Sequence, residues 1–463
     1  MLFNSEVFLF LFLPVAYWVF WLLRARKQRY IWLTITGYAF YAGWNWKFCF
    51  LMLFSTLVSY TAGRLFLMPG WTPRQRKWIL GIPVTVDLLL LGFFKYADFT
   101  LQSFSSLLSF TGHPVHVPHL NIVLPIGISF YTFHTISYVV DSYRGNITPT
   151  ADLWEFASYV SLFSQLVAGP IVRFRQIEGD LENLGTASRG ALDSIGWSYF
   201  VIGLSQKLLI ADLIAAIIDP ALANFWPLGT VTTWACMLGY TYQLYFDFAG
   251  YSNMAVGLGY LFGIRIPQNF NTPYKADGIA DFWRRWHISL SSCLRDYIYI
   301  PLGGSRDGTG ATYRNLMYTM LIGGLWHGAN WTFVVWGAYH GILLCLNRIF
   351  DDQWRRIWRP ARLAITFLLV VIGWVFFRSR DFRMAAHLLR NMFAWVPSGN
   401  ILASETLAGL LLVAFAFAHF GRNTFEMNHK WSFGMTCVWV SLFGVCLLRI
   451  VTSNGSPFLY FQF

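Results

Sequence analysis

Residues 281–328 contain two short runs that each carry a histidine, and the rest of the chain is best understood around them. The first run, WHISLS, covers residues 286–291, and the second, GGLWHG, covers residues 323–328. His287 follows an Arg-Arg pair in a charged segment, whereas His327 lies in an apolar span beside small residues. An ionisable group at membrane depth is costly and is therefore a candidate functional residue. We predict that most of the chain is a scaffold that holds these two imidazoles on a path through a bilayer.

The composition is that of a membrane protein. Of the 463 residues, 56% are hydrophobic and only 12% are charged, whereas about a quarter of the residues in soluble domains are charged. The formal net charge is +12, and the cations gather in short loops between apolar stretches. Membrane topology and anionic lipid explain that pattern better than nucleic acid does. The six cysteines have no CxxC spacing, which argues against a zinc or disulfide framework.

Apolar stretches recur along the chain and predict an all-α polytopic membrane protein. At roughly 20 residues per span we expect about eleven transmembrane helices plus re-entrant pieces, in a single integral membrane domain over residues 1–463. Residues 315–347 contain no Asp, Glu, Lys or Arg, and we expect two helices there, joined near residues 328–330. Residues 101–110 are too short to span. The Lys- and Arg-rich loops at residues 24–29, 74–77 and 348–362 are predicted to be cytoplasmic.

Residues 279–300 are predicted to form a helix that cannot face lipid, because it carries five charged residues: Asp281, Arg284, Arg285, Arg295 and Asp296. We expect it at the interface, or within the membrane and wrapped in protein or water. On a regular helix Arg284 and His287 would share one face. His327 follows Asn315 by about 18 Å of helix, which places it near the middle of the bilayer. We therefore predict that both histidines line one tunnel, approached from opposite faces of the membrane.

Two other groups of polar residues stand out. Lys207 and Asp212 are five positions apart in an otherwise apolar span, a spacing that does not pair well on a helix, so we expect them to face a cavity. His113, His116 and His119 alternate with prolines. Prolines break the helix that would align these imidazoles, so an extended loop with solvated histidines is favoured over a metal site.

Several enzyme classes are unsupported, since the chain has no GxSxG elbow, no Gly-Lys dipeptide of a P-loop and no HExxH zinc motif. A buried imidazole tends to be neutral near pH 7 and can act as a general base on a hydroxyl. Acyl transfer also needs hydrogen-bond donors for the oxyanion, which Asn330, a second histidine or a backbone N–H could supply. Two alternatives remain: that both histidines are core residues fixing helix packing, and that the protein is a non-enzymatic transporter. A transporter would more often show two equivalent halves, and none is visible.

Six runs occur in order along nearly the whole chain: LPIGISFYTF (124–133), AGPIVR (168–173), YFDFAGYS (245–252), FWRRWHISLS (282–291), RDYIYIPLGG (295–304) and GLWHGANW (324–331). Together they resemble the membrane-bound O-acyltransferase family, and within it the bacterial branch of alginate O-acetylation. The resemblance implies a helical fold around a funnel and a narrow tunnel. His327 matches the family's membrane histidine, and His287 matches a second histidine of the bacterial branch. Arg284 and Asn330 are predicted to support them, and Asp247 lies in a matching run without an assigned role.

The resemblance also implies an O-acetyltransferase in the bacterial inner membrane, with no metal and no permanently bound cofactor. The acyl donor would be a cytoplasmic thioester, here acetyl-CoA. The acetyl group would pass across the membrane to a periplasmic SGNH-type polysaccharide acetyltransferase or accessory protein, which modifies an exopolysaccharide of the alginate or cellulose type. D-alanyl transfer from a carrier-protein thioester to teichoic acid is the competing interpretation.

Overall fold

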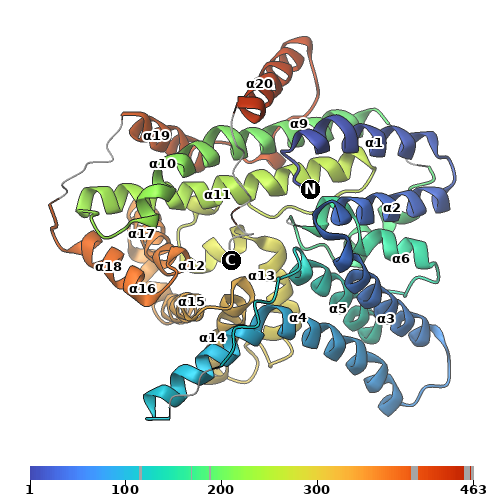
Figure 1. Cartoon of the computed structure of the whole chain (residues 1–463), viewed down its shortest axis with the longest axis horizontal. Coiled ribbons are helices and arrows are strands. Elements are labelled where there is room, and N and C mark those ends of the chain that lie inside the picture. The colour runs from blue at the N-terminus through green and yellow to red at the C-terminus, as the bar shows by residue number, and fades with distance from the viewer. Residues whose placement is uncertain (114–116, 168, 187–188, 398–404, 453–458, 460–463) are drawn as a thin grey trace. The chain divides into compact units, whose positions relative to one another are not determined.

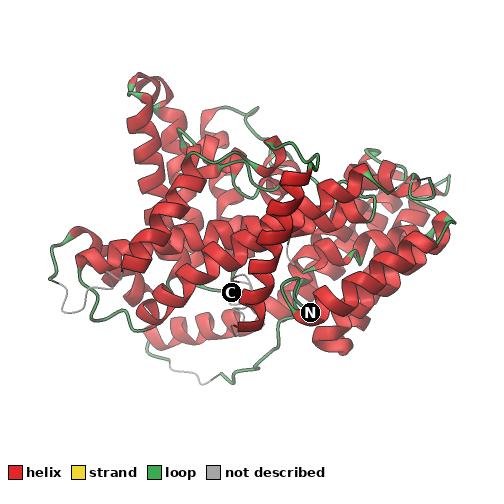
Figure 2. Cartoon of the chain, turned by 90° about the horizontal axis from the view of Figure 1, so that it is seen from above, coloured by secondary structure: helices red, strands yellow, loops and turns green. Residues whose placement is uncertain are grey.

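The computed structural model describes residues 1–113, 117–167, 169–186, 189–397, 405–452 and 459. Within these residues every regular element is a helix, as Figure 2 shows. The chain forms two compact units: residues 1–197 with 255–267, and residues 198–254 with 268–463. It passes between the units within α9 (Ala191–Ser205) and α11 (Thr230–Leu261). The prediction of one domain over residues 1–463 stays a prediction.

The first unit contains a group of long helices whose buried polar groups are paired. Asp87 of α4, alone in an apolar stretch, accepts hydrogen bonds from Ser55 of α3 (2.6 Å) and Thr135 of α5 (2.7 Å), so its carboxylate is satisfied inside the helix group. The elements that belong wholly to this unit are η1 (Phe8–Phe12), α1 (Leu13–Leu22), α2 (Arg26–Asn45), η2 (Trp46–Phe48), α3 (Cys49–Leu67), α4 (Pro73–Phe110), α5 (Ile128–Arg144), α6 (Leu153–Val160), α7 (Phe163–Leu166) and α8 (Phe174–Glu182).

The helix α4 is longer than the sequence suggested. Residues 101–110 are its last turns, and no separate piece follows the apolar stretch 78–94. Thr72 and Gln75 form a capping box at its start, with Thr72 N–H donating to Gln75 Oε1 at 2.9 Å. The helix has 38 residues, a length of about 57 Å. It continues through residues 95–98 because that polar stretch contains no helix-breaking Gly or Pro.

The second unit contains the α14–α15 pair, whose helices run alongside each other in Figure 1. The connection falls at residues 328–330, as predicted. A Cβ at Gly324 would collide with the Phe333 carbonyl, and one at Gly337 with the Met320 carbonyl, so these glycines permit the close approach. The elements that belong wholly to this unit are η3 (Gln206–Ala211), α10 (Asp212–Ala223), η4 (Pro273–Lys275), α12 (Ile279–Arg285), α13 (Ile288–Leu294), η5 (Arg295–Tyr299), α14 (Thr309–His327), α15 (Trp331–Ile349), α16 (Asp351–Arg356), α17 (Arg359–Arg378), α18 (Phe382–Phe393), α19 (Glu405–His419), η6 (Thr424–Glu426) and α20 (Phe433–Thr452).

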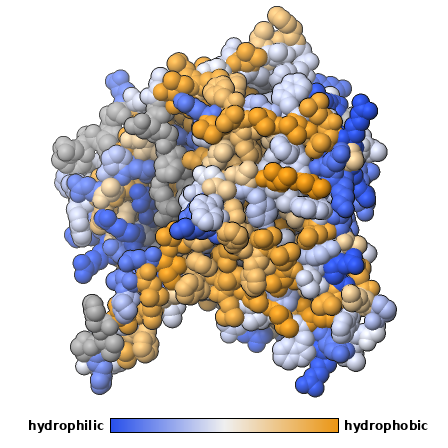
Figure 3. All heavy atoms as spheres, turned by 45° about the vertical axis from the view of Figure 1, so that its right-hand side comes forward, coloured by the Kyte–Doolittle hydropathy of each residue, from blue (hydrophilic) through white to orange (hydrophobic). Residues whose placement is uncertain are grey.

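The chain is a multi-pass membrane protein. In the described residues, five helical segments are long and apolar enough to cross a bilayer: Arg26–Leu67, Pro73–Phe110, Leu192–Ala223, Arg359–Arg378 and Phe433–Thr452. Two shorter apolar helices, Phe8–Leu22 and Glu405–His419, accompany them. Figure 3 shows broad hydrophobic areas on the surface, as expected for a protein that faces lipid tails. The helical membrane fold is confirmed, and the number of about eleven spans stays a prediction.

One turn of π-helix, η3, changes how two buried charges meet. A π-helix bonds residue i to residue i+5, so Lys207 and Asp212 come to the same side of the helix. Their side chains form an ion pair, with Lys207 Nζ 2.6 Å from Asp212 Oδ1. The expectation that these residues face a cavity instead of pairing is therefore wrong, because it assumed regular α-helical spacing.

Candidate functional site

The segment predicted as one helix over residues 279–300 is broken at His287. α12 ends at Arg285 and α13 begins at Ile288, and His287 between them has φ 42° and ψ 55°. This left-handed conformation is uncommon for a residue other than glycine. It turns the His287 side chain away from the face of α12: the His287 residue is 0% exposed, whereas the Arg284 side chain is 72% exposed.

Arg284 therefore does not share a face with His287, and that prediction is wrong. Its guanidinium lies 3.6 Å from Asp281 Oδ1, one turn earlier in α12. Arg285 pairs with the same carboxylate at 2.8 Å. The two arginines and the aspartate thus form an ion-pair group on α12. A supporting role for Arg284 in the site stays a prediction.

Asn269 connects the loop before η4 to the break at His287. Its Oδ1 lies 3.0 Å from His287 Nδ1 and accepts hydrogen bonds from Ser289 N–H (3.3 Å) and Ser289 Oγ–H (2.8 Å). Its Nδ2 donates to Ser252 Oγ of α11 at 3.0 Å. The backbone joins in, since Ile288 N–H donates to the Asn269 carbonyl at 2.8 Å. We did not predict a role for Asn269, which lies in a polar, Pro-interrupted stretch 18 positions before His287.

Aromatic rings enclose the rest of the His287 imidazole. The ring centroids of Phe248, Trp326 and Phe270 lie 4.7, 5.8 and 6.4 Å from it. His287 Nε2 is buried and has no hydrogen-bond partner within the part of the chain that the structure describes. Burial lowers the pKa of His287, which lies outside the five candidate spans. The imidazole is therefore neutral at neutral pH, and Nε2 is the polar atom left to meet a substrate.

His327 is the last residue of α14 and is 5% exposed. Its imidazole packs against the rings of Trp326 (5.0 Å), Trp336 of α15 (5.0 Å) and Phe377 of α17 (5.1 Å). α14 begins at Thr309, earlier than Asn315, so His327 lies about 27 Å from the helix start. We expected 18 Å, and the difference places His327 at a helix end beside the α14–α15 turn. Its depth in a bilayer stays a prediction.

One indole contacts both histidines. The Trp326 ring centroid lies 5.8 Å from that of His287 and 5.0 Å from that of His327, and Trp326 itself is 6% exposed. Two imidazoles far apart in sequence are thus brought to the same buried side chain within the second unit. A continuous tunnel between them stays a prediction.

Asn330 organises the turn that follows His327. Its Oδ1 accepts a hydrogen bond from Thr332 N–H at 3.0 Å, which caps α15. Its Nδ2 donates to the Arg380 carbonyl just beyond α17 at 2.8 Å. These bonds fix the end of α14 relative to α15 and α17. The proposal that Asn330 also stabilises an oxyanion stays a prediction.

Asp247 is buried in α11 and is held by two contacts. Its Oδ1 lies 2.7 Å from Lys207 Nζ, and its Oδ2 accepts a hydrogen bond from Leu459 N–H at 2.9 Å. The next residue, Phe248, packs edge-on against His287. Asp247 therefore anchors the part of α11 that touches His287, which is the role we could not assign from sequence.

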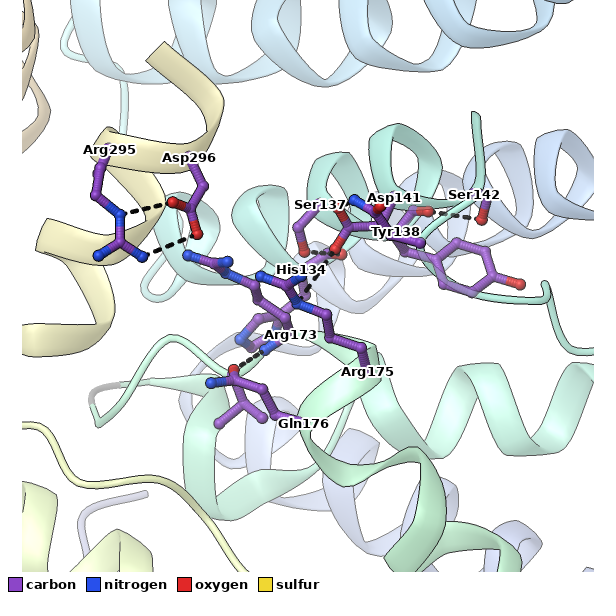
Figure 4. Close-up of polar contacts among 12 residues, drawn as sticks. His134, Ser137, Tyr138, Asp141, Ser142, Arg173, Arg175, Gln176, Arg295 and Asp296 are labelled. Carbon is purple, nitrogen blue, oxygen red and sulfur yellow. Dashed lines mark hydrogen bonds and ion pairs between the residues drawn. The ribbon is translucent and has the colours of Figure 1, made fainter. Parts of the chain in front are cut away.

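The remaining polar residues of the matching runs have local partners (Figure 4). In the second unit, Arg295 Nε donates to Asp296 Oδ1 at 2.7 Å. In the first unit, Arg173 N–H donates to Gln176 Oε1 at 2.7 Å, which caps α8, and Arg175 lies 3.8 Å from Asp141. The AGPIVR run thus has a structural role at the start of α8.

The histidine loop gives no metal geometry in the described residues. His116 lies outside them. His113 Nδ1 lies 3.1 Å from the Thr111 carbonyl, and His119 Nδ1 lies 3.1 Å from Gln102 Nε2. In the described ranges no group of three or more His, Cys, Asp or Glu residues could hold a metal ion.

A helical membrane scaffold with two buried histidines beside one indole is the context in which the sequence comparisons can be judged. The profile of the membrane-bound O-acyltransferase family matches residues 43–379. The chain belongs to this family, and it is an acyltransferase. Family membership takes precedence over the transporter interpretation that composition alone left open.

Among its relatives, the chain is similar to bacterial enzymes named for polymer modification. It is 42% identical, over the full length of both chains, to the probable alginate O-acetylase AlgI of Pseudomonas putida. It is 37% identical to the peptidoglycan O-acetyltransferase of Helicobacter pylori, over 85% of this chain and 80% of that one. It is 30% identical to the teichoic acid D-alanyltransferase of Bacillus subtilis, over 60% of this chain and 75% of that one.

Proposed function

We propose that this protein takes an acetyl group from a cytoplasmic thioester, acetyl-CoA, and passes it across the bacterial inner membrane. The acetyl group then reaches an exopolysaccharide of the alginate or cellulose type through a periplasmic partner transferase of the SGNH type or an accessory protein. The full-length similarity to a probable alginate O-acetylase supports this substrate class. The contact of His287 and His327 with the same buried indole is the structural observation that carries the proposal.

The chemistry assigns one role to each histidine. His327 accepts the proton of an acceptor hydroxyl while the hydroxyl oxygen attacks the thioester carbonyl. The C–S bond breaks, the oxygen–acyl bond forms, and the leaving thiolate receives the proton held by His327. The products are an acetyl ester and a free thiol. His287 positions the donor, because its Nε2 is buried without another partner in the described residues.

The slender arm of a thioester suits a buried site better than a whole nucleotide does. The Arg-rich loop at residues 348–362 provides cations that would attract the phosphates of coenzyme A. The nucleotide would stay at the membrane surface while the arm enters. The donor, the partner and the inner-membrane location are parts of the proposal.

Inside-out membrane vesicles that contain the full chain test the proposal directly. We expect acetyl-CoA labelled in its acetyl group to transfer label to polymer-linked acceptor, with release of free thiol, and His327→Ala vesicles to do neither. A D-alanyl carrier-protein thioester serves as the parallel donor. Use of that donor and not of acetyl-CoA would overturn the proposal in favour of D-alanyl transfer, the activity named for the Bacillus relative.

A further inference from the structure

We propose that Asn269 is a positioning residue that holds His287 in the tautomer protonated on Nδ1, so that Nε2 presents a lone pair to the substrate. The assignment of the proton follows from hydrogen-bond geometry alone. The consequence for acyl transfer rests on the proposed function.

The orientation of the Asn269 amide is fixed by a group that can only donate. Ser289 N–H lies 3.3 Å from the Asn269 atom that also faces His287, so this atom must be the carbonyl oxygen. On the other side of the amide, Nδ2 donates to Ser252 Oγ at 3.0 Å. A flipped amide would set two donors against each other at the Ser289 backbone.

The proton on His287 then has one possible place. The Asn269 oxygen lies 3.0 Å from His287 Nδ1, and an oxygen acceptor at that distance requires an N–H donor. Ser289 Oγ is 3.4 Å from the same nitrogen but only 2.8 Å from the Asn269 oxygen, so its hydrogen belongs to the shorter bond. In a neutral imidazole with hydrogen on Nδ1, Nε2 is an acceptor.

This assignment restricts the substrate group that His287 can meet. A neutral Nε2 accepts a hydrogen bond, so its partner must be an O–H or N–H group. The carbonyl oxygen of a thioester cannot be that partner, but an amide N–H of the donor arm or the hydroxyl of the acceptor can. His287 therefore recognises a hydrogen-bond donor on the substrate, and Asn269 is the reason.

The charges around His287 leave this role to Asn269. The side chains in contact with the imidazole are uncharged: Phe248 of α11, Phe270 and Asn269 of the loop, Ser289 of α13 and Trp326 of α14. The ionisable neighbours of these contacts along the chain are already engaged or are the second histidine. Asp247 pairs with Lys207, Arg285 pairs with Asp281, and His327 follows Trp326.

Two substitutions of Asn269 separate positioning from folding. Asn269→Asp keeps an acceptor for His287 and Ser289, and the Ser252 hydroxyl can turn to donate to it. A carboxylate at this distance favours the imidazolium and raises the pKa of His287. We expect thiol release from acetyl-CoA to keep its plateau within about threefold of wild type while the acid limb of its pH profile moves up by about 1–3 units. Asn269→Leu, which has no acceptor, should lower the rate by about tenfold or more at every pH.

Asn391 provides the matched control. It is also a buried asparagine of the second unit, and its Nδ2 donates to the Leu228 carbonyl. Asn391→Asp and Asn391→Leu should change the amount of folded protein without moving the pH profile. An Asn269→Asp profile that overlays the wild-type profile, or an Asn269→Leu variant with the wild-type rate per folded molecule, would overturn the proposal.

A spectroscopic test does not depend on activity. Imidazole ¹⁵N chemical shifts distinguish the two neutral tautomers, and the His287 signals can be assigned as those lost in His287→Asn. We expect the Nδ1-protonated form in wild type and mixed tautomers in Asn269→Leu. Nε2 protonation in wild type would refute the inference. If the expected tautomer is present but wild-type vesicles do not use acetyl-CoA, the proposed donor is wrong and the tautomer assignment stands.

Discussion

His287 and His327 are both buried and both contact Trp326, yet they are held in opposite ways. His287 sits in a helix break with a left-handed backbone, and amide and hydroxyl groups fix its ring. His327 ends a regular helix, and rings from the neighbouring helices α15 and α17 pack around it. The orientation of His287 is therefore sensitive to single polar groups, whereas the position of His327 is sensitive to the volume of its neighbours.

The largest effect is expected for His327. We expect His327→Ala to insert normally but to lower polymer acetylation by about 10²–10⁴-fold, the usual contribution of general acid–base catalysis. Membrane abundance and polymer acetyl content should be measured together. His340 of α15 is a matched control, because it is 0% exposed and contacts the same Trp336 ring at 5.0 Å. His340→Ala should lose less activity per molecule, and wild-type acetylation in His327→Ala would end the catalytic interpretation.

His287 should matter less, because it positions a substrate and does not carry the reacting proton. We expect His287→Ala to lower thiol release by about 10–10²-fold, and His287→Asn to fold better because asparagine tolerates the left-handed backbone. The His287→Ala/His327→Ala double variant should be no slower than the slower single variant if the two groups act as a unit. Multiplicative losses in the double variant would show that the two histidines act independently.

Trp326 is the side chain that the two sites share. We expect Trp326→Ala to lower the rate by about tenfold, because the imidazoles lose their common contact and a cavity opens between them. Trp326→Phe keeps a ring in place and should cost less. The comparison is made from kcat and KM for acetyl-CoA in vesicles with equal amounts of protein. Equal rates for Trp326→Ala and wild type would mean that the shared contact has no functional role.

The smallest effect is expected at Arg284, three residues before His287. Its side chain is 72% exposed, so Arg284→Gln should change stability by no more than about 0.5 kcal/mol and leave the rate within about twofold. Thermal unfolding in detergent and vesicle activity check both values. A large loss of activity with unchanged stability would instead support the donor-binding role that the sequence suggested.

The features that follow from local composition could be predicted from sequence. Long apolar stretches identified a helical membrane protein, and the uncharged stretch 315–347 with its central Gly-Ala-Asn identified the α14–α15 pair. Both depend only on hydrophobicity and on residues that break helices. The membership in the acyltransferase family was visible for another reason, since six runs in a fixed order are a specific pattern.

The features that depend on backbone exceptions or distant contacts could not be predicted. Residues 279–300 contain no Gly next to His287 and no Pro near the break, so the left-handed residue had no local signal and Arg284 was placed on the wrong face. Asn269 reaches His287 through a loop, and such a contact leaves no periodic pattern in sequence. The ordinary spacing rules for α-helices also misplaced Lys207 and Asp212.

The π-helical turn at η3 has a consequence for insertions and deletions in this helix. Compared with a regular α-helix, the turn accommodates one extra residue between Lys207 and Asp212. A chain with one residue fewer in this stretch would have the same lysine and aspartate at i and i+4, which also face each other on an α-helix. The helix segments on either side could then keep their packing, including the close approach of Gly203 to Gly250. Length variation is thus tolerated at this one turn, where a change of register elsewhere in the helix would rotate every buried side chain beyond it.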